Sequence, residues 1–194
     1  MILWIRARRA FPVLVPGLLA FLAVITVGRQ ENVLLPGLTN SGRNQVQLVH
    51  FAPLIVTSTL AYCLAQRLPE AELTTVRRIR LLDVALVTVA TTLAVSASCL
   101  VAGITHTDLV YEAGRNTLFL VGLMLVAGAL HPQAATPAPV AWVFAVMFAG
   151  YQDYDRPWIW AVTLHPAHIV VTACLCLLVF AAGLVVGGRS PRSS

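Results

Sequence analysis

Six apolar stretches divide this chain, and its thirteen cationic side chains are all arginines that lie in the gaps between those stretches. A segment of about 20 apolar residues can cross the hydrocarbon core of a bilayer. A helix is suited to that crossing because it satisfies its own backbone groups. The sequence therefore predicts an all-α, polytopic membrane protein with about six transmembrane helices, in a single transmembrane domain that covers residues 1–194.

Composition supports the same class. The chain is 58% hydrophobic and only 11% charged, and its mean hydropathy is +0.82. In soluble domains about 25% of residues are charged. A soluble globular domain is therefore excluded.

The fifth apolar stretch is the least regular of the set. Three prolines in the segment 131–139 remove backbone donors and favour a turn. Only about a dozen residues remain between Val140 and Tyr151. This span is tilted, partly re-entrant, or extended back into the proline segment. We expect the six spans at about 11–28, 50–66, 83–105, 116–130, 138–151 and 166–187.

Arginine asymmetry predicts the orientation. With the amino terminus in the cytoplasm, nine arginines fall on that side and four outside, in agreement with the positive-inside rule. The outer four are Arg29, Arg43, Arg115 and Arg156. Both termini are therefore predicted to be cytoplasmic. An aromatic cluster in one outer loop fits an interfacial belt: Tyr151, Tyr154, Trp158 and Trp160.

The first nine residues resemble the positive region of a signal peptide, but no small-x-small cleavage site follows the apolar stretch. We interpret this stretch as an uncleaved anchor. Residues 1–9 form either a short helix in the inner interface or a plain positive flank.

The cytoplasmic connection from Pro69 to Arg80 carries the clearest helix signals outside the spans. Proline suits a first turn, Glu70 and Glu72 fall near the positive helix end, and Arg77 and Arg78 fall near the negative end. A short helix is predicted at 69–80. It docks on a cytosolic partner or lies on lipid headgroups.

Missing residues constrain the function. The chain has no lysine, so it has no phosphate-binding loop of the form G-x-x-x-x-G-K-[ST]. No Asp, Glu or Arg is expected near the middle of a span, which disfavours a self-contained ion-coupled carrier. No H-E-x-x-H or G-x-S-x-G sequence is present. We expect no catalytic residues, no enzyme activity in this chain and no cofactor.

Histidines were weighed as metal or haem ligands. His50, His106, His165 and His168 are expected near the outer face, with Asp108 and Glu112 in the same layer. A site requires these regions to converge, and interfacial histidines are common without one, so no metal ligand is assigned. The cysteines are interpreted as small apolar residues within the spans: Cys63, Cys99, Cys174 and Cys176.

Small residues predict helix contacts. Gly183 and Gly187 form a G-x-x-x-G sequence on the sixth span, and Ala90, Ala94 and Ser98 form a stripe on the third. These contacts are internal or belong to a dimer interface. The hydroxyl groups of the third span line a polar path or bond their own backbone carbonyls.

The arrangement as a whole resembles the membrane subunit of a type-2 ABC exporter. The resemblance is architectural and covers the whole chain. It includes a basic amino-terminal segment, Met1–Arg9, six spans, a cytoplasmic helix, Pro69–Arg80, and an aromatic outer segment, Tyr151–Trp160.

The resemblance implies a permease subunit that pairs with itself or with a similar membrane subunit. A separate ATP-binding subunit would dock on Glu70, Glu72, Arg77 and Arg78. The substrate is unidentified; the outer tryptophans suit an amphipathic cargo, and interfacial anchoring explains them equally well. The alternatives are a non-transporting scaffold or accessory subunit and a metal- or haem-handling membrane protein. Composition indicates a bacterial cytoplasmic membrane, and no nucleic-acid partner is expected.

Overall fold

A computed structural model describes residues 10–28, 32–35, 44–66, 76–153 and 156–189. In these parts of the chain the body of the molecule consists of α-helices, so the predicted helical fold class is confirmed. The helices are α2 (Ala10–Val27), α3 (Ala52–Ala65), α4 (Val76–Thr105), α5 (Asp108–Leu130), α6 (Pro137–Ala149) and α7 (Val170–Arg189).

Short elements connect these helices. The 3-10 helices are η2 (Leu48–Phe51), η3 (Pro132–Ala134) and η4 (Val162–Leu164). Strand β1 (Asn32–Leu35) pairs antiparallel with β2 (Asn44–Gln47), with Asn32 opposite Gln47. Strand β3 (Tyr151–Asp153) pairs in the same sense with β4 (Arg156–Pro157).

Within the described parts of the chain, four helices are long and apolar enough to cross a bilayer: Leu48–Ala65, Leu81–Thr105, Asp108–Leu130 and Val170–Gly188. The first of these combines η2 and α3. Two further apolar helices, Phe11–Val27 and Pro137–Ala149, are shorter. By length and composition this is a membrane protein.

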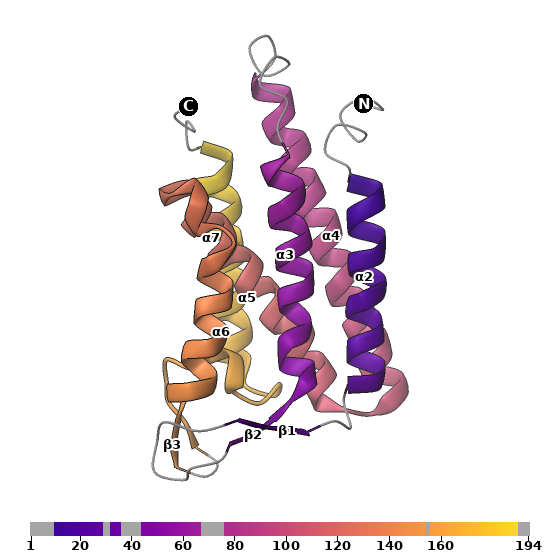
Figure 1. The fold of residues 1–194 in the computed structure, drawn as a ribbon, viewed down its shortest axis with the longest axis vertical. Coiled ribbons are helices and arrows are strands. Elements are labelled where there is room, and N and C mark those ends of the chain that lie inside the picture. The colour runs from indigo at the N-terminus through magenta and orange to yellow at the C-terminus, as the bar shows by residue number, and fades with distance from the viewer. Residues whose placement is uncertain (1–9, 29–31, 36–43, 67–75, 154–155, 190–194) are drawn as a thin grey trace.

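Successive helices alternate in direction through the bundle (Figure 1). The start of α2, the end of α7 and the start of α4 lie at one end of the molecule. The two strand pairs lie at the other end, which we call the strand end. A two-residue turn at the strand end joins α4 to α5, and His106 in this turn has a positive φ of 50°.

Helix α5 is the centre of the fold and packs against α3, α4, α6 and α7. Its inward side chains join those of α2, α3 and α4 in one apolar core that includes Phe21, Ile25, Leu60, Val87 and Met124. A second cluster lies between α5, α6 and α7 and includes Phe119, Val143, Met147 and Cys176. Apolar side chains therefore fill the interior of the bundle on both sides of α5.

Helices α5 and α7 are in close backbone contact at two glycines. A Cβ atom on Gly122 would lie 2.7 Å from the backbone of Val179 and Phe180, and one on Gly183 would lie 2.7 Å from the carbonyl oxygen of Gly122. A Cβ atom on Gly187 would meet nothing closer than 3.8 Å. Of the predicted glycine pair, Gly183 is therefore used within the chain.

Three boundaries differ from those expected. Helix α5 begins at Asp108 and not near 116, because Asp108 favours the positive end of a helix and the polar residues that follow find partners inside the protein. Residues Val76 to Arg80 are continuous with α4, since no helix breaker separates them from the span. Helix α7 begins at Val170, four residues after Pro166.

The fifth helix extends back into the proline segment, as one of the three alternatives proposed. Pro137 and Pro139 lie in the first turn of α6, where a proline lacks only a donor that would be unpaired in any case. The helix ends at Ala149 after 13 residues.

Candidate functional site

The structure places Arg115 inside the protein, although the sequence suggested an outer loop. Arg115 is the eighth residue of the 23-residue helix α5, and only 8% of its surface is exposed. A buried guanidinium must have partners, because its desolvation is costly. Its surroundings therefore define the first candidate site.

Most of those partners come from the segment 161–169, which precedes α7 and contains the 3-10 helix η4. Nη2 of Arg115 donates to the carbonyl oxygens of His165 at 2.7 Å and Val162 at 3.5 Å. Nη1 donates to the carbonyl oxygen of Pro166 and to Oγ1 of Thr172, both at 3.1 Å. One arginine thus ties this segment and the first turn of α7 to α5.

Asn116 extends the same contact. Its Oδ1 accepts from Nε and Nη2 of Arg115 at 3.4 and 3.2 Å, and its Nδ2 donates to the carbonyl oxygen of Thr163 at 2.8 Å. All three guanidinium nitrogens therefore have acceptors within the chain. We call Arg115 and Asn116, with the carbonyl groups they bind, the arginine clamp.

Glu112 lies one helix turn before Arg115 and is 7% exposed. Its carboxylate accepts a hydrogen bond from the backbone N–H of Ala167. Residues three positions apart lie on the same helix face, so Glu112 and Arg115 face the same segment. Glu112 and the clamp together therefore bind one N–H group and four carbonyl groups of the 161–169 backbone.

A small cavity lies beside the clamp. Its polar lining is His50 from η2, Asn116 and Thr163, and its apolar lining is Leu120, Val143, Met147 and Leu164. Its volume of about 10 Å³ is room for about one water molecule. It is too small for an organic substrate.

The hydrogen bonds of the arginine clamp serve a structural role. A guanidinium has five N–H donors and no acceptor, and here each of its nitrogens is bound to an oxygen of the same chain. No free cationic group faces the cavity from Arg115. The arrangement can hold a segment of backbone in place.

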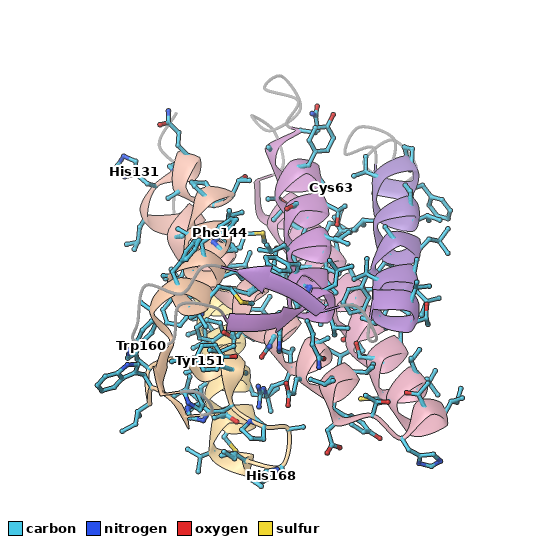
Figure 2. All side chains as sticks on the ribbon, turned by 60° about the horizontal axis from the view of Figure 1, so that its bottom comes forward. Cys63, His131, Phe144, Tyr151, Trp160 and His168 are labelled. Atoms are coloured by element: carbon cyan, nitrogen blue, oxygen red, sulfur yellow. The ribbon has the colours of Figure 1, made fainter. Side chains whose placement is uncertain are left out.

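The histidines do not converge. His50 is half-buried and lies near Arg115, whereas His106 is exposed in the α4–α5 turn. His131 and His168 lie far apart in Figure 2. Among the described residues, no group of three His, Cys, Asp or Glu side chains could hold a metal ion.

The structure also places the cysteines and two hydroxyl groups of α4. Cys63 and Cys176 are buried, Cys99 and Cys174 are exposed, and none of the four forms a disulfide bond. On α4, Thr88 and Ser98 donate to carbonyl oxygens of their own helix, those of Val84 and Ala94. These two hydroxyls follow the second of the two alternatives and do not line a polar path.

The proposed docking residues fall at the edge of what is described. Glu70 and Glu72 lie outside the described residues. Arg77 and Arg78 lie in the first turn of α4, and their side chains are outside the described part of the chain.

Sequence reasoning missed the clamp because it began the fourth span at Asn116. The apolar residues Leu109, Val110 and Ala113 repeat at helical spacing, and Glu112 and Arg115 form an i, i+3 pair. Those two signals extend the helix back to Asp108.

Comparison with protein families, curated proteins and solved structures finds no match for this chain.

Proposed function

We propose that this chain is the permease subunit of an ATP-driven transporter, in which a separate chain hydrolyses ATP. Its arrangement supports the proposal: apolar helices alternate in direction, and both ends of the described chain lie at the same end of the bundle as the start of α4 (Figure 1). We further propose that this end faces the cytoplasm of a bacterium.

The observation that carries the proposal is the packed interior of the bundle. Apolar side chains fill the space on both sides of α5, and the buried polar groups of the clamp are bonded to one another. A substrate path through such a chain would run along its surface, against a second membrane subunit. A half-transporter that pairs with itself or with a similar chain is the arrangement that meets this requirement.

Helix α4 supplies a rigid element for docking. Its 30 residues correspond to about 45 Å, whereas the hydrocarbon core is about 30 Å thick. If the apolar part from Leu81 lies in lipid, the turns that carry Arg77 and Arg78 project beyond it. We propose that an ATP-binding subunit contacts these turns together with Glu70 and Glu72.

Co-purification tests the proposal. A tagged chain, crosslinked mildly in its native membrane, is expected to retain a protein with a lysine-containing phosphate loop, and the purified pair is expected to hydrolyse ATP. The double variant Arg77→Glu, Arg78→Glu should lose that protein. Arg189→Glu, at the same end of the bundle on α7, is the matched control and should retain it.

Failure of the unmodified chain to retain any ATP-binding protein would favour the second candidate, a non-transporting scaffold or accessory subunit. The packed interior favours that candidate too, because a scaffold needs no substrate path. The two differ in reconstituted vesicles, where only the permease gives ATP-dependent movement of a solute. Amphipathic solutes should be tried first, because Trp158 and Trp160 are exposed at the strand end.

A further inference from the structure

The segment between α6 and α7 follows a helix that is too short to cross a bilayer on its own. Helix α6 has 13 residues, which correspond to about 20 Å. This is about 10 Å less than the thickness of the hydrocarbon core. Another segment of the chain must therefore cover the rest of the hydrocarbon thickness on this side of the molecule.

After the β3–β4 pair the chain turns back along α6. The N–H group of Trp158 donates to the carbonyl oxygen of Gly150, at the end of α6, at 2.8 Å. The ring of Trp160 then packs edge-on against that of Trp142, with 6.1 Å between their centroids. Trp142 precedes the last residue of α6 by seven positions, about 10 Å along the helix.

The next residues enter the protein itself. Ala161, Val162 and Thr163 are all buried. Thr163 and Leu164 share the small cavity with Val143 and Met147 of α6. The segment therefore reaches back into the bundle to the level of the middle of α6.

Backbone that is not part of a continuous α-helix requires other internal hydrogen-bond partners at membrane depth, because lipid provides none. The arginine clamp provides them for the carbonyl groups of Val162, Thr163, His165 and Pro166. Glu112 accepts from the N–H group of Ala167. In water, solvent could bind these backbone groups and the loop would not need such partners. In lipid, the loop needs them, because no solvent hydrogen bonds are available.

The outward side of residues 158–160 is apolar. Trp158, Ile159 and Trp160 are 42%, 90% and 41% exposed, and Trp160 lies at the edge of the molecule in Figure 2. Tryptophan favours the boundary between headgroups and acyl chains. An isoleucine that is 90% exposed suits contact with acyl chains.

We propose that residues 157–169 form a re-entrant segment, which enters the bilayer from the strand end and returns to it without crossing. The Trp158–Ile159–Trp160 turn contacts the lipid acyl chains beside the end of α6, and Arg115 and Asn116 hold the segment at that depth. This inference requires a bilayer and does not depend on the proposed transport function.

Tryptophan fluorescence tests the depth directly. A variant with Trp4→Phe, Trp142→Phe and Trp158→Phe keeps Trp160 as its single tryptophan. In vesicles, its emission should be quenched by phospholipids brominated on their acyl chains and be protected from iodide in the water. The control replaces all four tryptophans by Phe and adds Asp108→Trp, at the first residue of α5 and the same end of the bundle.

Control emission should show the opposite preference, with strong quenching by iodide. If iodide quenched Trp160 as strongly as the control, the segment would lie in water and the proposal would be wrong. Protection of Trp160 from both quenchers would also contradict it, because the turn must touch acyl chains.

The role of the clamp is tested in the same single-tryptophan protein. Arg115→Ala should increase the iodide quenching of Trp160, because the freed carbonyl groups are stable only in water. Asn116→Ala, which removes the bond to Thr163, should give a smaller increase and serves if Arg115→Ala fails to fold. Unchanged quenching in the folded variants would overturn the role assigned to these two residues.

Discussion

Arg115 shows how a charged residue is accommodated in an apolar helix. Its five donors point in a fixed planar fork, and the acceptors around it come from α5 itself, from the segment before α7 and from Thr172. Lysine has three donors on a single atom and cannot reach acceptors on several sides in this way. The site therefore specifies arginine by geometry as well as by charge.

Replacement of Arg115 should destabilise the protein in a graded manner. Arg115→Ala leaves buried carbonyl groups without donors and should reduce the free energy of unfolding by about 2–4 kcal/mol. Arg115→Lys should cost less than Arg115→Ala, because it retains some of these bonds. Thermal unfolding in detergent measures both changes. Thr26→Ala is the control, since its exposed hydroxyl bonds only to its own helix, and it should be nearly neutral.

Thr172 should be energetically coupled to Arg115. Thr172→Val removes the hydroxyl that accepts from Nη1 of Arg115 and donates to Ile169, with an expected loss of about 1 kcal/mol. In the background of Arg115→Lys the same change should cost less. Additive losses in this double-mutant cycle would show that the contact contributes nothing to stability.

At the scale of helices, α5 and α7 are held together by direct contact of their backbones. No side chain separates Gly122 from Gly183, so the two helix axes approach as closely as the chain permits. The arginine clamp joins the same two helices nearer the strand end. The α5–α7 pair is therefore fixed at two levels along its length.

The two glycines of the G-x-x-x-G sequence should respond differently to alanine. Gly183→Ala forces a methyl group against the backbone of Gly122 and should cost about 1–3 kcal/mol. Gly187→Ala places its methyl group 3.8 Å from Leu125 and should be neutral or slightly stabilising. Melting temperatures of the two variants in the same detergent make the comparison. Equal destabilisation would place Gly187 in a contact with another chain.

Hydropathy predicted the position of each apolar helix described here, because segments suited to lipid are strongly enriched in apolar residues. Helix α2, for example, was expected at about 11–28 and is observed at Ala10–Val27. The start of α5 was missed because Glu112 and Arg115 look like loop residues when their partners are unknown. Those partners lie about 50 residues away along the chain, and no local pattern identifies them. The roles of Gly183 and Gly187 also depend on the neighbouring helix, so spacing alone could not separate them.

For the whole molecule, the alternating helices predict which parts of the chain share a side of the membrane. Gln133, between α5 and α6, is exposed at the end where α2 begins, and Asp108 is exposed at the strand end. In a cysteine-free background, an impermeant maleimide applied to intact cells should label Asp108→Cys and should not label Gln133→Cys. Inside-out vesicles should give the reverse. Labelling of both variants from one side would contradict a crossing by α5.

The position of the arginine clamp also sets an order for biogenesis. Helix α5 leaves the ribosome about 50 residues before Val162, His165 and Pro166, whose carbonyl groups satisfy Arg115. Until those residues are made, Arg115 lacks most of its acceptors, and α5 is a poor substrate for release into lipid. The insertion machinery would thus retain α5 until α7 is synthesised. Insertion of α5 would be completed only when α7 is present.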